Sequence, residues 1–175
     1  MAILPIITAP DPRLKRTCRP VAAVDDEIRR MMDDMLETMY AAPGIGLAAP
    51  QVGVDLRVIV VDVAKEGSPP SPHCLANPEI LWSSEDHALY NEGCLSLPEQ
   101  FAEVERPAKV RVGYLDRDGK PRELEADGLL AVCIQHEMDH LEGVLFVDHV
   151  SRLKREMILK RLAKAKKRES ESVPA

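Results

Sequence analysis

The sequence has 175 residues, of which 45% are hydrophobic and 30% charged, and its formal net charge is −6. This length fits one domain with a substantial core of its own. No apolar run is as long as a bilayer is thick, and the first residues lack the basic start of a secretory signal, so we expect a cytoplasmic protein without a membrane anchor. The four cysteines show neither a CxxC pair nor a dense disulfide spacing, which favours reduced thiols.

The charge is distributed unevenly. Between Arg152 and Arg168 the chain carries nine Lys/Arg residues and one acid, a local charge of +8 that leaves −14 for everything else. A basic arm therefore follows an acidic body.

The chain begins with an extended arm and a helix. Prolines punctuate residues 1–20 and predict an arm that packs on the domain. Residues 25–40 open with a capping aspartate and acids in the first turn, and their apolar positions follow the 3.6-residue period of a helix. The methionines of this stripe indicate core packing rather than a binding surface.

Small residues dominate residues 42–53, which contain the string Gly44-Ile-Gly-Leu-Ala-Ala49. A dinucleotide-binding fingerprint of this kind needs a strand before it and a helix after it, whereas here a helix precedes and a strand follows. The nucleotide hypothesis therefore fails on context. A tight connector is the simplest alternative, but small residues also let a ligand approach the backbone closely, and Gln51 offers an amide that can donate to an oxygen.

The middle of the chain predicts short strands separated by turn residues. The expected strands span residues 57–63, 75–82, 87–90, 101–105, 109–115 and 122–126. The last two alternate around residues 116–119, whose Asp-Arg-Asp-Gly sequence is typical of a hairpin. No internal repeat or second domain is evident.

Two helices are expected in the C-terminal part. Apolar residues recur at three- and four-residue steps in residues 127–143, and Gly143 fits a left-handed stop after the last turn. Ser151 begins a final basic helix, 151–168, before a polar tail, 169–175, that we expect to be disordered. The fold class is α+β: a single domain, 1–168, with antiparallel or mixed sheets around the helix at 127–143.

His136 and His140 stand one helical turn apart on the buried face of this helix. At this spacing two imidazoles project side by side and can bind one metal ion, while Glu137 can reach the edge of the site and accept a proton from metal-bound water. The spacing suits a metal-dependent hydrolase. The alternative is a helix whose histidines only pack in the core or lie at the surface.

Two histidines leave a catalytic metal one protein ligand short. Zinc proteases of the HExxHxxGxxH type need a histidine where this chain has Phe146, which excludes that subclass. A thermolysin-like site would use Glu156, which is a weak candidate. Cys94, in a short segment bracketed by glycine and proline, is modestly favoured over Cys133, which shares the helical face of the histidines.

Three motifs follow one another along the chain: Gly44-Ile-Gly-Leu-Ala-Ala-Pro-Gln51, Glu92-Gly-Cys-Leu-Ser96 and Gln135-His-Glu-Met-Asp-His140. In order and spacing they resemble the signature motifs of bacterial peptide deformylases, over roughly residues 3–165. Each motif is weak alone, but the ordered set is highly specific. The resemblance implies removal of the formyl group from the N-terminal formyl-methionine of nascent polypeptides, with release of formate, as a step of N-terminal methionine processing in protein biosynthesis.

The resemblance also assigns roles within the site. It implies three metal ligands, Cys94, His136 and His140, with a water as the fourth. The metal of the family is usually Fe²⁺, with Zn²⁺ and Ni²⁺ as substitutes, and the ligand types do not select among them. A divalent metal can lower the pKa of its water to about 7, so that hydroxide attacks the formyl carbon while Glu137 acts as general base and then as general acid. The charge on the formyl oxygen would be stabilised by the metal, the Gln51 amide and the Leu95 backbone N–H.

Substrate contacts are implied in the same way. The pocket for the methionine side chain should have an apolar lining: Ile45, Leu129, Val132 and Cys133. The backbone from Gly44 to Gly46 and that of Gly93 should pair with the substrate like an added strand. Glu92 should support the ligands from behind, unless it forms only a surface ion pair. Phe101 stands where the best-known members have an arginine, so the resemblance does not predict contacts to substrate side chains beyond the methionine.

The basic final helix implies docking on ribosomal RNA near the peptide exit, and a solvated charged face is the alternative. We expect a monomer. Two other functions remain to be weighed. A peptidase of the HExxH type would cleave internal bonds and accept unformylated peptides. A protein that binds metal or RNA without catalytic activity would be expected to lack Glu137, Gln51 or the Cys94 motif. All three are present, which favours an enzyme.

Overall fold

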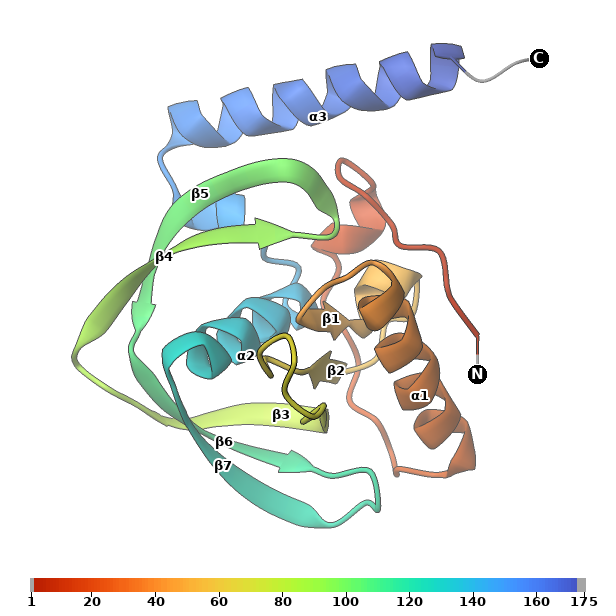
Figure 1. Cartoon of the computed structure of the whole chain (residues 1–175), viewed down its shortest axis with the longest axis vertical. Coiled ribbons are helices and arrows are strands. Elements are labelled where there is room, and N and C mark those ends of the chain that lie inside the picture. Colours follow the sequence, from red (N-terminus) through yellow and green to blue (C-terminus); the bar gives the residue numbers. More distant parts are fainter. Residues whose placement is uncertain (1, 173–175) are drawn as a thin grey trace.

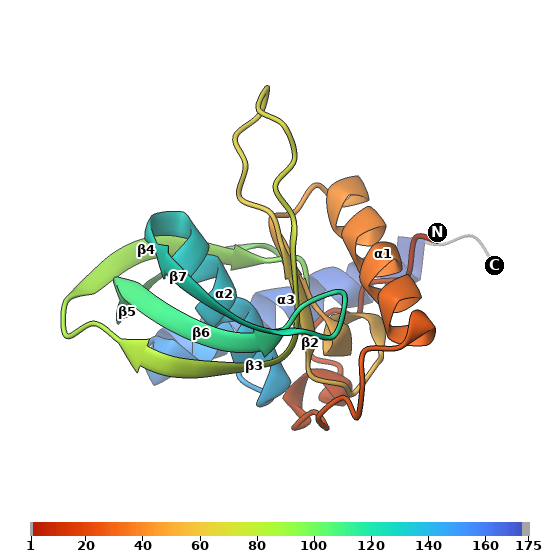
Figure 2. The ribbon, with the colours of Figure 1, turned by 90° about the horizontal axis from the view of Figure 1, so that it is seen from below.

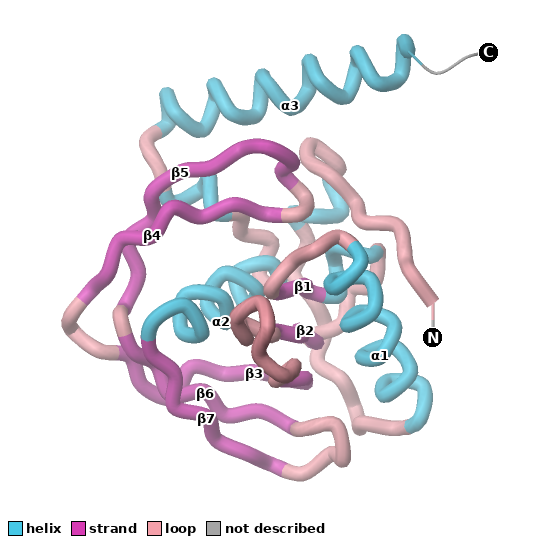
Figure 3. The backbone as a smooth tube through the Cα atoms, viewed as in Figure 1, coloured by secondary structure: helices cyan, strands magenta, loops and turns pink. Residues whose placement is uncertain are grey.

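The computed structural model describes residues 2–172 and builds them around one buried helix, α2 (Gly128–Leu141). Figure 1 shows α2 between a five-stranded sheet and a separate two-stranded ribbon. Figure 3 shows strands on several sides of this helix. The α+β class and the central position of the histidine-bearing helix are thereby confirmed.

The five-stranded sheet is antiparallel throughout and has the order β1-β2-β3-β6-β7. Its strands are β1 (Gly46–Ala48), β2 (Val58–Val61), β3 (His73–Ser83), β6 (Lys109–Leu115) and β7 (Pro121–Asp127). The ribbon pairs β4 (His87–Cys94) with β5 (Leu97–Pro107). Figure 2 shows the connection between β2 and β3 projecting from the body of the molecule.

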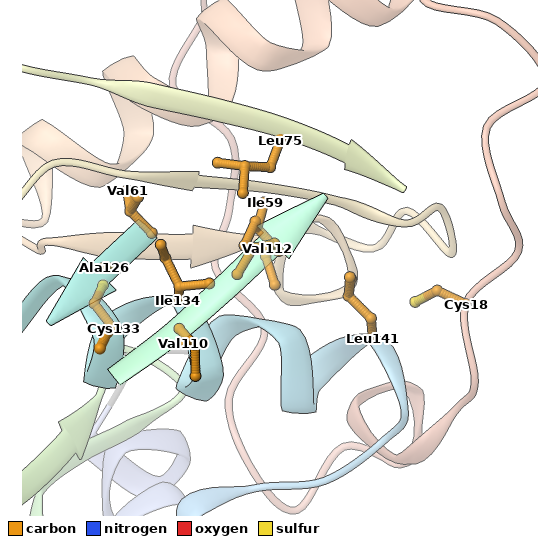
Figure 4. Packing of buried hydrophobic residues seen from close by; sticks show 12 residues of the cluster. Cys18, Ile59, Val61, Leu75, Val110, Val112, Ala126, Cys133, Ile134 and Leu141 are labelled. Atoms are coloured by element: carbon orange, nitrogen blue, oxygen red, sulfur yellow. The ribbon is translucent and has the colours of Figure 1, made fainter. Parts of the chain in front are cut away.

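The main core lies between α2 and the sheet. All four residues of β2 are fully buried, as expected of a short β-branched strand covered on both faces. Figure 4 shows Ile134 of α2 beside Val61 of β2 and Val110 and Val112 of β6. Because this contact fixes one face of α2, the helix presents its histidines to the opposite side, toward the ribbon.

Helix α1 (Asp26–Ala41) follows the sequence prediction closely. The Asp25 carboxylate accepts a hydrogen bond from the Ile28 N–H at 3.0 Å and caps the first turn. Met32, Met35 and Met39 are fully buried against β1 and β2, so the methionine stripe is core, as predicted.

The N-terminal arm is extended and packs on the domain, with one 3-10 turn, η1 (Pro12–Lys15). The Ile7 N–H donates to the Gln51 carbonyl at 2.7 Å, and the Ala9 N–H donates to the Ser96 carbonyl at 2.8 Å. The arm therefore ties together two of the three motifs, which the sequence did not predict.

Helix α3 (Arg152–Ser172) is the basic C-terminal helix. Ser151 caps it, since its hydroxyl accepts from the Lys154 N–H at 3.3 Å, and Ile158 and Leu162 pack into a second core cluster. Figure 1 shows α3 lying across β5. The helix runs four residues beyond the end predicted at Arg168, so part of the predicted disordered tail is helical, and residues 173–175 of that tail lie outside the described residues. None of the helices in residues 2–172 combines the length and hydropathy that a membrane span requires.

The strands of the ribbon are longer than predicted, and β1 was predicted only as a connector. Pro98 and Gly93 resemble strand breakers in the sequence, but a two-stranded ribbon has a free edge on each strand, where a proline loses no ladder hydrogen bond. Cys94 pairs with Leu97 across a tight turn. The Glu92–Ser96 motif, expected only as a short bracketed segment, thus lies at the tip of a hairpin.

Candidate functional site

Three side chains from two elements form a cluster of metal-binding atoms. Cys94 ends β4, while His136 and His140 lie one turn apart on α2. The ligand atoms of the three all lie within 4.8 Å of one another, and Cys94 Sγ is 3.4 Å from His140 Nε2. The structure thus brings together the three predicted ligands, and Cys94 is the thiol that joins the histidines.

The donor set fits a divalent transition metal. The Glu92 carboxylate accepts a hydrogen bond from His136 Nδ1 at 2.9 Å, which leaves Nε2 of that ring with a lone pair for a metal. Burial lowers the pKa of His140 well below its usual value and keeps this ring neutral, whereas the pKa of His136 is raised, against burial, by its hydrogen bonds to Cys94 and Glu92, so a metal would have to displace a proton from this second ring. Glu137 Oε1 is buried and has no hydrogen-bond partner among the described residues. An orphaned carboxylate oxygen beside two imidazoles and a thiol is consistent with a hydrated metal ion at this point.

Glu92 supports the ligands from behind and is not part of a surface ion pair. It is 6% exposed and accepts two hydrogen bonds from Arg106, at 2.7 Å from Nε and at 2.9 Å from the terminal nitrogen. A second terminal nitrogen of Arg106 donates to Asp139 Oδ2 at 2.8 Å. The buried guanidinium therefore holds two carboxylates at once.

Arg106 is a functional residue that the sequence analysis missed. It alternates along β5 with Ala102 and Val104, and all three are buried. An arginine on the buried face of a strand needs a carboxylate partner, so the period-2 pattern of β5 was the signal that could have found it.

Gln51 is held rigidly beside Cys94. Its Oε1 accepts from the Ala48 N–H at 2.9 Å, and its Nε2 donates to Ser96 Oγ at 3.0 Å and approaches Cys94 Sγ at 3.4 Å. The side chain is 1% exposed. Ser96, also fully buried, is a second residue whose role the sequence analysis did not foresee, although it belongs to one of the three motifs.

Glu137 lies next to the ligands, with Oε1 3.9 Å from His140 Nε2. Burial raises the pKa of Glu137 to about 7, so its carboxyl group can both take up and release a proton near neutral pH. Gly46 makes this position possible, because a Cβ at Gly46 would lie 2.5 Å from Glu137 Oε2.

Two cavities adjoin the cluster. The larger, of about 570 Å³, is lined by His136 and Glu137 together with Gln51, Leu95 and the glycines at 44, 46 and 93. Phe101, 61% exposed, also lines this cavity.

The smaller cavity, of about 100 Å³, is lined on one side by the four predicted pocket residues, Ile45, Leu129, Val132 and Cys133. His136 and Glu137 line it as well, so it lies beside the cluster. Cys133 Sγ is 3.5 Å from the Ile45 carbonyl, and burial raises the pKa of this thiol well above its usual value. Among the described residues, the ligand atoms that converge are those of Cys94, His136 and His140, whereas the Cys133 thiol lies in the pocket wall, which removes it as a rival metal ligand.

Glu156 lies away from the cluster. It is on α3, exposed, and accepts a hydrogen bond from Arg152 at 3.0 Å. The thermolysin-like arrangement is thereby excluded.

Two imidazoles, one thiolate and an adjacent buried carboxyl group define a metal-dependent hydrolase. The profile described as "Polypeptide deformylase" matches residues 3–156, and the chain belongs to this family. A peptide deformylase of Methylocella silvestris is 65% identical over 170 residues, which are 95% of this chain and 87% of that protein.

Solved structures agree. The crystal structure of a peptide deformylase from Legionella pneumophila has a TM-score of 0.90 and 45% identity, covering 99% of this chain and 100% of the other. That of the enzyme from Ehrlichia chaffeensis has a TM-score of 0.91 and 39% identity, covering 96% and 99%. The activity of this chain is accordingly that of a peptide deformylase, which removes the N-formyl group from nascent polypeptides.

Proposed function

We propose that Glu137 carries the proton in this hydrolysis, as general base toward water and then as general acid toward the amine that leaves. The observation that carries the proposal is the buried carboxyl group with an unpartnered oxygen 3.9 Å from His140 Nε2. A pKa near 7 lets one group perform both transfers at neutral pH. The formyl amide is thereby split into formate and a free N-terminal amine.

The metal ion belongs with Cys94, His136 and His140. When bound, a divalent ion supplies Lewis acidity toward the formyl oxygen and a water of lowered pKa. We propose Fe²⁺ as the native ion because it is the usual metal of the family, and Zn²⁺ or Ni²⁺ as substitutes because a thiolate with two imidazoles suits all three. Metal analysis of protein purified without air, followed by reconstitution with each ion, tests this choice.

Gln51 and the Leu95 backbone N–H are proposed to stabilise the negative charge that grows on the formyl oxygen. Hydrogen bonds at both ends of its amide group hold Gln51 beside the ligands, with one N–H of Nε2 donated to Ser96 Oγ and the other directed at Cys94 Sγ. The N–H that faces the thiol is the donor that would pass to the formyl oxygen. Both residues line the cavity of about 570 Å³ next to His136 and Glu137. The loss of one such donor typically lowers the rate on the order of 100- to 1000-fold.

The cavity of about 100 Å³ is proposed to take the methionine side chain. Its walls at Ile45, Leu129, Val132 and Cys133 are apolar, and it lies beside Glu137. An unbranched thioether side chain adapts well to a narrow apolar pocket. Filling it by Val132→Phe should raise KM for formyl-methionyl peptides while metal content stays unchanged.

The peptide backbone is proposed to add a strand to the sheet at β1. This strand lies at the end of the order β1-β2-β3-β6-β7, so its outer edge is not paired within the sheet. Gly44, Gly46 and Gly93 line the same cavity and leave room for a second backbone.

Glu137→Gln tests the proton-transfer role. This variant keeps the size of the side chain but removes its basicity, so kcat should fall on the order of 100-fold or more at matched metal content. Glu142→Gln is the matched control, because Glu142 is exposed at the end of the same helix and pairs with Arg57. Equal kcat for wild type and Glu137→Gln would show that another group carries the proton.

Helix α3 is proposed to dock on ribosomal RNA near the exit of the nascent chain. Its lysines at 164, 166 and 167 are exposed on the end of the helix that lies beyond Leu162. Charge reversal at these three positions should weaken ribosome binding strongly and leave hydrolysis of a short formyl-peptide unchanged. Equal loss of both would indicate a structural role for α3.

Two further proposals concern location and assembly. Because ribosomes in the cytoplasm release the formylated nascent chains, we propose that the enzyme acts there. We also propose that it acts as a monomer, which the mass of the particle in solution would test.

A further inference from the structure

One short helix reaches the metal ligand His136 from two directions. This helix is η3 (Phe146–His149), which lies outside the three motifs. On one side, the Phe146 ring stacks on the His136 ring, with centroids 6.1 Å apart and planes inclined by 24°. Phe146 is 1% exposed, so its ring cannot move freely.

On the other side, η3 reaches His136 through a chain of hydrogen bonds. His149 Nε2 and Asp139 Oδ2 are 2.8 Å apart. The same oxygen accepts from Arg106 at 2.8 Å, Arg106 donates twice to Glu92, and Glu92 accepts from His136 Nδ1. Five side chains thus form one connected path from the surface to a metal ligand.

The path transmits position because its central member is rigid. A guanidinium group is a planar fork with fixed donor directions, so the point at which one end is held decides where the other end points. Arg106 is 5% exposed, and Glu92 takes two of its donors. Asp139 accepts from the other terminal nitrogen of Arg106, and His149 contacts Asp139 from the solvent side.

The helix η3, where this path begins, is itself held in place. Asp148, the neighbour of His149 in η3, accepts from Lys15 at 2.6 Å, from Arg155 at 2.8 Å and from the Leu145 N–H at 2.8 Å. The N-terminal arm and α3 therefore both anchor η3. These contacts of Asp148 hold η3, and with it His149, in place beside Asp139 without any contribution from the metal.

We propose that Asp139 and His149 are positioning residues for the metal ligand His136, acting through Arg106 and Glu92. This inference rests on the metal site described above and adds two residues to it. Removing a group that orients a metal-bound imidazole typically lowers metal affinity roughly 10- to 100-fold. His149 contacts Asp139 and not Arg106, so we expect its removal to have a smaller effect than the removal of Asp139.

The test is a cobalt titration of metal-free protein, followed through the thiolate-to-cobalt absorption band. Asp139→Ala should weaken cobalt binding on the order of 10-fold. His149→Phe should weaken it about 3- to 10-fold, the effect of one lost hydrogen bond, whereas His149→Gln keeps a donor and should bind nearly as wild type does. The double variant Asp139→Ala/His149→Phe should bind no more weakly than Asp139→Ala alone, because both act on one path.

Two controls separate positioning from folding. The melting temperature of each metal-free variant shows whether the chain still folds. His87→Phe removes an exposed histidine from the start of β4, about 20 Å along the strand from Cys94, and should leave cobalt affinity unchanged.

The outcomes distinguish this inference from the function it rests on. Wild-type affinity in folded His149→Phe and Asp139→Ala, or additive losses in the double variant, would overturn the positioning role and leave the metal site intact. A wild-type protein that binds no cobalt would contradict the metal site and this inference together.

Discussion

Replacing Gly46 by alanine should disable the enzyme by displacing Glu137. The new Cβ would lie 2.5 Å from Glu137 Oε2 and 2.7 Å from Cys133 Sγ. Both side chains belong to α2 and are buried, so neither can retreat into solvent. The φ angle of Gly46 is not in the positive range, so alanine meets no backbone strain and the collision is the main effect.

The magnitude follows from the contact. Ordinary carbon–oxygen contacts lie near 3.4 Å or beyond, so the carboxyl group must move by about 1 Å, a misplacement that can cost on the order of 100-fold in rate. Overpacking of this kind also costs about 1–3 kcal/mol of stability, or about 2–4 °C of melting temperature per kcal/mol in a chain of this size. Activity should therefore fall far more than stability does.

The assay is kcat/KM for formate release, measured with the melting temperature and the metal content of the same preparation. Gly113→Ala is the matched control, since Gly113 lies in β6 and the three atoms nearest to its Cβ all belong to the Leu81 side chain, the closest at 3.1 Å. Activity of Gly46→Ala within about threefold of wild type would refute the argument that close packing against Gly46 positions Glu137.

Three other changes test the framework of the site. Glu92→Ala leaves the Arg106 guanidinium buried without its main partner and should lower the free energy of unfolding by about 3–5 kcal/mol in urea titrations; a loss below about 1 kcal/mol would mean that the pair is not buried in solution. In Gly143→Ala, a residue with a φ of +73° gains a Cβ that collides with the Lys15 carbonyl oxygen, so the free energy of unfolding should fall by more than about 1 kcal/mol. An unchanged urea midpoint would contradict the left-handed conformation and close packing of Gly143 after α2. Removal of the metal by a chelator should lower stability by about 4 kcal/mol when metal was present at 1,000 times its Kd, and calorimetric traces that coincide with and without chelator would contradict a metal bound only by the folded chain.

Local patterns predicted the helices well. The cap at Asp25, the methionine stripe and the stop at Gly143 depend on neighbours within a turn or two, and each lies where the sequence predicted. The same holds for His136 and His140, whose spacing alone places them on one face of α2. Periodicity is a reliable signal when the partners are close in sequence.

Residues brought together by tertiary packing were harder to predict. Spacing favoured Cys94 over Cys133 only modestly, because the choice depends on how the β4–β5 ribbon folds over α2. The role of Arg106 depends on the same packing, since its partners come from β4 and from α2. Only the resemblance to the deformylases identified the third ligand before the fold did.

The most direct test of the central claim is formate release under anaerobic conditions from formyl-Met-Ala-Ser by the fully metallated protein, compared with acetyl-Met-Ala-Ser. We predict one formate per peptide, an intact Met-Ala-Ser product and no reaction with the acetylated peptide. The absence of formate, or cleavage of an internal peptide bond in either substrate, would contradict deformylation and would favour a peptidase or a protein that only binds metal.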